Sequence, residues 1–323
     1  MAKKPFRFSW QAFNASSAAE WRDKARRAEA LGYSTFHIAD HYLGNGPALE
    51  PTNHPVQELA AIPALAMAAE ATSTINVGFR VACTGYRPAP ILVKEAMTID
   101  FLSEGRLEMG LGAGWMKAEY EAMGIPFDKP GTRITRLEET IKLAKSAIRG
   151  DMLDIRGEHV HAVGYEAVPR PPRGKIPIMV GGGAPRILGI AGREADIVSI
   201  NLNNSSGIFD AASFASSTAQ ETHEKLGWIK NGAGDRFDDI ELEIGMIFIV
   251  IDGAGKEEAE SWAKVMGIPI EGMPSWPHAL IGSIDSICED LERRREEYGI
   301  SYICINDVYA EAFAPVVARM SGK

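Results

Sequence analysis

The sequence predicts an α/β fold, and within that class it favours a (β/α)8 TIM barrel over a doubly wound parallel sheet. Apolar segments of strand length alternate with amphipathic helical segments along the whole chain, which is typical of a parallel sheet. Eight such units fit into the 323 residues, and eight units close a barrel. Two of the expected strands also run directly into glycines, which leaves bare backbone at their carboxyl ends.

The N-terminal half supplies the first four units. Ser17 and Glu20 form a capping box at the start of the first helix, and Gly32 is a typical stop after its last turn. A longer helix is indicated by apolar residues at helical spacing from Ile134 to Ile148. The strands expected in this half cover residues 6–13, 33–38, 75–82 and 107–111, and two further helices cover 63–71 and 90–102.

The C-terminal half completes the count. Residues 152–155 and 159–163 flank Arg156-Gly157-Glu158 and predict a small hairpin inserted outside the barrel. Residues 203–239 form the longest polar stretch, and we expect a barrel insertion that covers the mouth. Because no linker divides the chain, residues 1–323 are expected to form a single barrel domain. The remaining strands are expected at 176–180, 196–200, 241–251 and 301–305, with a helix at 283–298.

The amino-acid composition limits the classes of partner and the cellular setting that we expect. The formal net charge is −9, which argues against a general nucleic-acid or membrane-surface partner. The three cysteines, Cys83, Cys288 and Cys304, are far apart and show no metal-ligand spacing. We therefore expect no metal and a reduced, cytoplasmic setting. We also see no signal peptide and no apolar run long enough to span a membrane.

The glycines after the fourth and fifth strands are candidate ligand contacts. Gly112, Ala113 and Gly114 follow the strand at 107–111, and they fit either a ligand-lining backbone or a tight strand-to-helix turn. Gly181, Gly182 and Gly183 precede a helix that begins near Ala184-Pro185. Backbone N–H groups and the helix dipole can bind a phosphate there. No Gly-Lys-Ser/Thr follows, so this loop is not a P-loop.

Several short sequence segments follow one another in a characteristic order. They lie at residues 29–33, 39–41, 71–78, 94–100, 103–106, 110–115, 133 with 136–139, and 177 with 181–183. In order and spacing they resemble the bacterial luciferase-like oxidoreductases, and more closely the deazaflavin (coenzyme F420) branch of that family. The resemblance covers nearly the whole chain and is weakest from about Leu202 to Pro277. It implies a (β/α)8 barrel with a reduced deazaflavin or flavin at its C-terminal mouth, and a homodimer.

The resemblance also assigns residues. It implies that Asp40 and His41, after the second strand, lie close to the redox ring, where His41 could exchange a proton beside the hydride. The alternative is an aspartate that caps a turn and a histidine bonded to backbone. It further implies that Ala82 and Cys83 pack behind the cofactor at a bulge that often holds a non-proline cis peptide. Cys83 is assigned to packing rather than to nucleophilic chemistry, and it could equally be a small buried filler.

Two tryptophans are candidates for the substrate pocket. Trp115 stands where sugar-phosphate dehydrogenases of the family carry a glutamate acid, so a sugar phosphate is doubtful and a flatter, more apolar substrate is favoured. Trp10 ends the first strand and is a candidate pocket wall, although packing is the more usual role for an aromatic residue there. Arg133 and Arg136 are one helical turn apart, and the sequence does not choose which one faces the mouth.

The function expected from these features is hydride transfer between coenzyme F420 and a small hydrophobic organic substrate. A separate F420-reducing dehydrogenase would supply the reduced cofactor. One alternative is a two-component monooxygenase that uses reduced FMN from a partner reductase and consumes O2. Another is a non-catalytic protein that binds F420 or flavin. A nicotinamide Rossmann enzyme is excluded because its glycines would follow the first strand.

Overall fold

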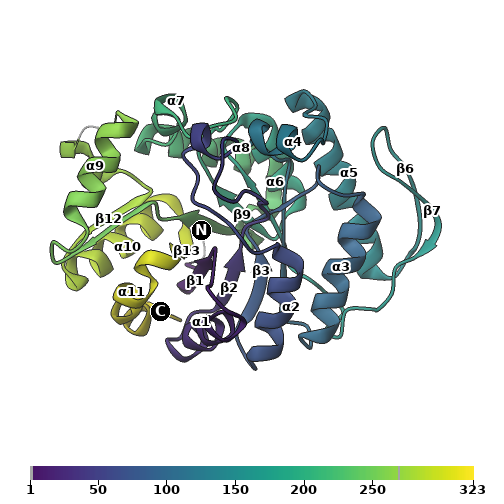
Figure 1. The fold of residues 1–323 in the computed structure, drawn as a ribbon, viewed down its shortest axis with the longest axis horizontal. Helices are drawn as coiled ribbons and strands as arrows, with labels where there is room; N and C mark the ends of the chain where they lie inside the picture. Colours follow the sequence, from purple (N-terminus) through teal and green to yellow (C-terminus); the bar gives the residue numbers. More distant parts are fainter. Residues whose placement is uncertain (1–2, 268–269) are drawn as a thin grey trace.

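The computed structural model describes residues 3–267 and 270–323 and shows a closed barrel of eight parallel strands surrounded by helices (Figure 1). Each strand pairs in parallel with the next along the chain, and β13 pairs with β1 to close the barrel. The strands are β1 (Arg7–Ala12), β2 (Thr35–Ile38), β3 (Asn76–Phe79), β5 (Leu107–Gly112), β8 (Ile178–Gly182), β9 (Ile197–Ile200), β10 (Glu241–Gly245) and β13 (Ile300–Asn306). This confirms the predicted (β/α)8 barrel.

A helix returns the chain to the amino end of the barrel after each strand. The helices are α1 (Ala18–Ala30), α2 (Ala61–Ala71), α3 (Ala89–Leu102), α5 (Pro130–Arg149), α6 (Pro185–Glu194), α8 (Ala219–Ala233), α10 (Ile284–Tyr298) and α11 (Asp307–Met320). The capping residue expected for α1 is present, because the Ser17 side chain accepts a hydrogen bond from the Glu20 N–H at 3.1 Å. Among the described residues, no helix has the length and apolar character needed to cross a membrane.

Two expected strands are each divided in the structure. The segment predicted at 75–82 forms β3 and then a separate β4 (Ala82–Cys83), and the peptide between Arg80 and Val81 is cis. The segment predicted at 241–251 leaves the barrel after Gly245, where a side chain would overlap the Arg80 guanidinium. The two segments contain Arg80, Glu241 and Glu243, so neither is a continuous apolar run, and the sequence pattern does not show where each strand ends.

The continuation of β10 forms a small layer beside the barrel. There β11 (Phe248–Ile251) pairs in parallel with β12 (Ala279–Gly282). Between these strands lie α9 (Lys256–Met266) and the 3-10 helix η3 (Ile270–Ser275). Their apolar side chains pack with Leu202 and Phe214 in a second core, which forms one wall of the barrel mouth.

Three shorter additions complete the fold. The predicted hairpin is confirmed as β6 (Met152–Arg156) and β7 (His161–Glu166), which project from the body beside α5 (Figure 1). Within the region 203–239, the additions are α7 (Ala211–Ala215) and the 3-10 helix η2 (Gly234–Asp239), whereas α8 is the barrel helix after β9 and packs against α6. A short α4 (Lys117–Ala122) and the 3-10 helix η1 (Glu50–Thr52) lie in loops at the mouth.

The amino end of the barrel is closed by a buried polar cluster around Glu108 on β5. The Glu108 carboxylate accepts hydrogen bonds from Arg7 at 2.7 Å, Thr35 at 3.0 Å, Asn76 at 3.1 Å and Tyr302 at 3.0 Å. Four donors from four other strands or strand ends satisfy this charge inside the barrel. The cluster therefore fills the amino end and leaves the carboxyl end as the open one.

Candidate functional site

A large cavity opens at the carboxyl ends of the strands. Its volume is about 810 Å³, within the range of small-molecule and cofactor sites. It runs continuously from the glycines at the carboxyl end of β8 to the loops after β1 and β2. This is the end of the barrel at which ligands bind in other (β/α)8 proteins.

Most of the sequence-predicted site residues line this cavity. Ala82 is fully buried in the main core, directly before the lining residue Cys83. Trp10 is not brought to the cavity. It packs against Tyr33 and Phe36, and its indole N–H donates to Asp307 at 2.7 Å. The predicted residues that line the cavity are Asp40, His41, Cys83, Gly112, Ala113, Gly114, Trp115, Gly181, Gly182 and Gly183.

Asp40 is held at the cavity wall by a two-point ion pair. Its carboxylate accepts hydrogen bonds from the Arg87 guanidinium at 2.9 and 3.0 Å, and Oδ2 also accepts the Cys83 N–H at 3.0 Å. Asp40 is 2% exposed. These contacts connect the end of β2 to β4, so Asp40 fixes the backbone on which Cys83 lies.

His41 carries its own carboxylate partner. Its Nδ1 lies 2.8 Å from Oε2 of Glu119 on α4. The fully buried Glu119 also accepts hydrogen bonds from the Tyr42 backbone N–H and the Tyr86 hydroxyl. Burial alone raises the pKa of Glu119, but these hydrogen bonds, that from His41 first, outweigh burial and lower the pKa.

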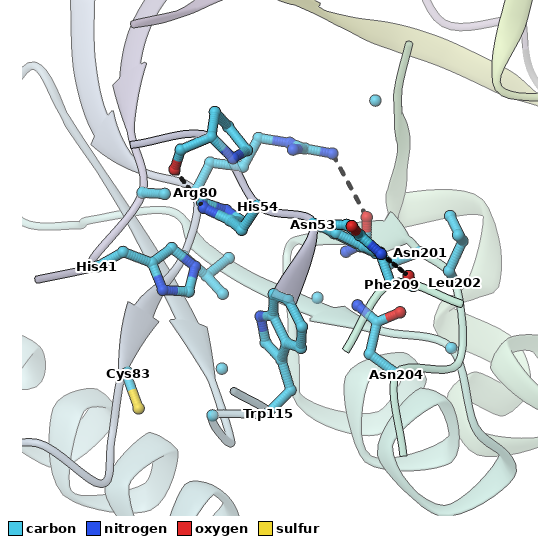
Figure 2. Close-up of a pocket in the computed structure, with 18 of the residues that line it drawn as sticks. His41, Asn53, His54, Arg80, Cys83, Trp115, Asn201, Leu202, Asn204 and Phe209 are labelled. Atoms are coloured by element: carbon cyan, nitrogen blue, oxygen red, sulfur yellow. Dashed lines mark hydrogen bonds between the residues drawn. The ribbon is translucent and has the colours of Figure 1, made fainter. Parts of the chain in front are cut away.

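Aromatic rings surround His41 on the cavity side. The His54 ring is 4.3 Å from the His41 ring, and the Trp115 ring meets His41 edge-on at 5.9 Å (Figure 2). Burial and the neighbouring His41 lower the pKa of His54 well below its ordinary value, so His54 is neutral at pH 7. His41 therefore has a neutral aromatic neighbour in His54.

The glycines at the carboxyl end of β8, Gly181 to Gly183, form a backbone cradle beside α6. No side chain caps the amino end of this helix, and Pro185 is in its first turn, so its first N–H groups remain available to an anion. A Cβ at Gly183 would overlap the backbone carbonyl of Leu202, and a Cβ at Gly182 would overlap Ile187 on α6. Gly182 therefore faces the helix, while Gly183 admits a close approach of the loop after β9. The residues present fit a phosphate group.

Two loops are joined across the mouth to form a roof. The Asn53 side chain donates to the Phe209 carbonyl at 2.8 Å, and the Phe209 N–H donates to the Thr52 carbonyl at 3.2 Å. The Phe209 ring lies 4.8 Å from Trp115 and stacks on His54 at 6.0 Å (Figure 2). The roof is thus aromatic on its inner side.

Two arginines line the cavity, and both donate hydrogen bonds to other residues of the protein. Arg80 donates to Glu243 at 2.9 Å and to Gln11 at 2.8 Å. Arg133 donates to the carbonyls of Asp128 and Gly114, and so is the member of the 133/136 pair that faces the cavity. Among the described residues that line the cavity there is no lysine and no other arginine.

Cys83 behaves as a packed thiol. Its sulfur lies 3.0 Å from the Tyr120 hydroxyl, and burial raises the pKa of Cys83 to about 12. This agrees with its assignment to packing. The cis peptide that the resemblance implied near Cys83 is present three residues earlier, between Arg80 and Val81.

Glu119, Phe209 and Arg80 are the site residues that sequence reasoning missed. Glu119 lies in a Glu-Tyr-Glu run that is typical of a solvent-exposed helix face. Phe209 is in the least regular stretch, and Arg80 is a single charge beside a strand. A feature that could have drawn attention to Glu119 is its position four residues after Trp115, just beyond the Gly112-Ala113-Gly114 segment.

We compared the chain with known protein families and with curated proteins. The model of the family described as luciferase-like monooxygenase matches residues 5–299. The chain is 28% identical over 197 residues to an F420-dependent glucose-6-phosphate dehydrogenase of Amycolatopsis mediterranei, a match that covers 61% of this chain and 56% of that protein. It is 30% identical over 169 residues to an uncharacterised protein of Mycobacterium tuberculosis, covering 49% and 58%. The chain thus spans less than two thirds of the length of these curated relatives.

Solved structures share the whole fold at low identity. The F420-dependent tetrahydromethanopterin reductase of Methanopyrus kandleri has a TM-score of 0.75 at 18% identity, with 98% and 99% of the two chains covered. An F420-dependent secondary alcohol dehydrogenase bound to an F420–acetone adduct has a TM-score of 0.76 at 15% identity, with the same coverage. A long-chain alkane monooxygenase has a TM-score of 0.74 at 13% identity, with 98% and 91% covered. By the extent of the family match, this chain belongs to the luciferase-like monooxygenase family, whose members are enzymes.

Proposed function

We propose that this protein is an F420-dependent oxidoreductase that transfers a hydride between the deazaflavin and a small, uncharged, apolar organic substrate. The observation that carries the proposal is the continuity of the cavity, which joins the uncapped amino end of α6 to His41. A ligand with a phosphate at one end and a reactive ring at the other fits such a space. The names of the curated relative and of two structural neighbours support F420.

The cofactor would be held by backbone rather than by charged side chains. The N–H groups at the start of α6 and the glycines at the carboxyl end of β8 would bind its phosphate. The segment around Val81, with Gly112 and Gly114, would lie along its ring. When bound, the deazaflavin supplies or accepts the hydride.

The substrate is inferred from the charges and rings of the other half of the cavity. Both lining arginines donate hydrogen bonds to other residues, so among the described lining residues no arginine or lysine is free to pair with a phosphate ester or a carboxylate. Trp115 and Phe209 provide a flat apolar wall. The Amycolatopsis relative acts on a sugar phosphate by its name, and we propose that this chain does not.

His41 would exchange the proton that accompanies the hydride. If the substrate is an alcohol, its carbon loses a hydride to the cofactor while its hydroxyl proton passes to His41, and a carbonyl is formed. In the reverse direction His41 donates that proton to the carbonyl oxygen. An imidazole can both accept and donate a proton, so one side chain serves both directions.

Monooxygenase neighbours of similar TM-score make reduced FMN with O2 the second candidate. The two candidates need different suppliers of reduced cofactor, namely an F420-reducing dehydrogenase or a flavin reductase. They also differ in whether oxygen is consumed.

The test is a titration of the protein with F420 and FMN, each oxidised and reduced, followed by tryptophan fluorescence. It is followed by turnover with uncharged alcohols and ketones under argon and under air. We expect micromolar or tighter binding of F420 and oxygen-independent turnover. Preference for FMN with O2 uptake would replace the proposal by the monooxygenase. If F420 or FMN binds without turnover, and His41→Ala binds the cofactor as tightly as the wild type, the protein would be a carrier rather than an enzyme.

A further inference from the structure

Glu119 is a buried carboxylate whose contacts converge on one side chain of the cavity. It lies on α4, outside the barrel strands, and is fully buried. It accepts hydrogen bonds from the Tyr42 N–H, from the Tyr86 hydroxyl and from His41. Within residues 3–267 and 270–323, its ion-pair partner is His41 alone.

The ionised carboxylate determines which ring nitrogen of His41 carries hydrogen. A carboxylate only accepts hydrogen bonds, so the hydrogen between Nδ1 of His41 and Oε2 of Glu119 belongs to His41. Glu119 stays ionised near neutral pH because its hydrogen bonds, including that from His41, lower its pKa in spite of burial. A neutral His41 is therefore the Nδ1–H tautomer, with a lone pair on Nε2.

The surroundings of the ring leave Nε2 to the cavity. His54 lies against the ring at 4.3 Å and the Trp115 ring at 5.9 Å, so rotation of His41 is restricted. In the described part of the chain, Nε2 of His41 has no hydrogen-bond partner, while His41 lines the cavity. Figure 2 shows His41 beside His54 and Trp115 in this space.

We propose that Glu119 is a positioning residue, which holds His41 as the Nδ1–H tautomer and presents Nε2 as the atom that exchanges the substrate proton. Tyr86 supports it by fixing the same carboxylate. The use of Nε2 in turnover rests on the proposed function, whereas the tautomer is a property of the protein without cofactor. The two statements can therefore fail separately.

The tautomer is tested by long-range ¹H–¹⁵N correlation spectra of ¹⁵N-histidine-labelled protein without cofactor, with His41 assigned by loss of its signals in His41→Gln. At a pH where the ring is neutral, we expect a protonated-type Nδ1 shift and an unprotonated-type Nε2 shift. Glu119→Gln should move both shifts toward the Nε2–H form, and Tyr86→Phe should do so partly. Glu121→Gln, an exposed control on the same helix, should change nothing. An Nε2–H form in the wild type, or no shift change in Glu119→Gln, would overturn the proposal.

Turnover provides the second readout. Glu119→Gln should lower kcat by roughly 10- to 100-fold, as for other residues that orient a functional histidine, with KM changed less than about twofold. In a His41→Gln background the same substitution should have little further effect, because both residues act at one step. Equal losses in both backgrounds would assign Glu119 to structure alone. If no turnover is found with any substrate, the NMR result still decides the tautomer.

Discussion

The carboxylate of Asp40 and the guanidinium of Arg87 form a two-point ion pair, with hydrogen bonds of 2.9 and 3.0 Å, at the edge of the cavity. The pair joins the end of β2 to the chain after β4, and Asp40 is 2% exposed. Removal of either partner of a buried ion pair destabilises a protein strongly, because the charge of the remaining partner is left buried without a counter-charge.

Asp40→Asn and Arg87→Gln should therefore each destabilise the protein, by about 3 kcal/mol in urea unfolding. The double variant should cost less than the sum of the two, because both substitutions break one interaction. Cofactor titrations separate this role from a catalytic one. A loss of F420 affinity or kcat in Asp40→Asn that Arg87→Gln does not reproduce would show that Asp40 acts directly on the cofactor or substrate.

Gly183→Ala should disrupt the phosphate cradle, since its Cβ would overlap the Leu202 carbonyl and displace the loop after β9. We expect F420 affinity to fall by at least roughly 10-fold, because the N–H groups at the helix start lose their alignment. Gly189→Ala is the matched control on α6, with open space around its Cβ. An unchanged dissociation constant for Gly183→Ala in isothermal titration calorimetry would remove the cradle from the cofactor site.

Trp115→Ala should weaken binding of flat apolar substrates, because it removes the ring that packs on Phe209 at 4.8 Å and on His41. We expect KM to rise by roughly 10-fold or more, with Trp115→Phe close to wild type. Trp115→Ala should also lose most of the fluorescence change on cofactor binding, whereas Trp228→Phe on α8 should keep it. A larger effect on kcat than on KM would instead place Trp115 in the chemical step.

The contact between α1 and the segment before β3 should become less stable at low pH, because it depends on the ionised carboxylate of Glu29. Although burial raises its pKa, hydrogen bonds from the backbone N–H groups of Ile75, Thr74 and Ser73 outweigh this and lower the pKa to about 2, against an ordinary value of 4.5. The stabilising contribution is therefore complete above about pH 4.5 and is lost as the pH falls through about 2.

Glu29→Gln should cost about 1 kcal/mol in the free energy of unfolding at pH 7. The difference from wild type should shrink steadily between pH 4.5 and pH 2, as measured by urea unfolding at each pH. Glu70→Gln, an exposed carboxylate on α2, is the control. A difference that stays constant over this range would mean that the charge of Glu29 does not contribute.

The sequence by itself determined the barrel, and it placed the glycines and the Asp40-His41 pair at one end of it. Both follow from local information. Apolar periodicity identifies strands and helices, and in a parallel barrel every segment after a strand lies at the carboxyl end. His41, Trp115 and Gly183 could therefore be assigned to one mouth without knowledge of their contacts.

The tertiary structure alone decided which of these residues meet and what faces them. Glu119 reaches His41 from 78 residues away, and Asn53 joins Phe209 across 156 residues. Trp10 lies outside the cavity lining, and its indole N–H donates to Asp307, 297 residues away. Such pairings depend on how the loops cross the mouth and on which atoms exclude each other there. They are set by packing between distant segments, which leaves no periodic trace in the residues on either side.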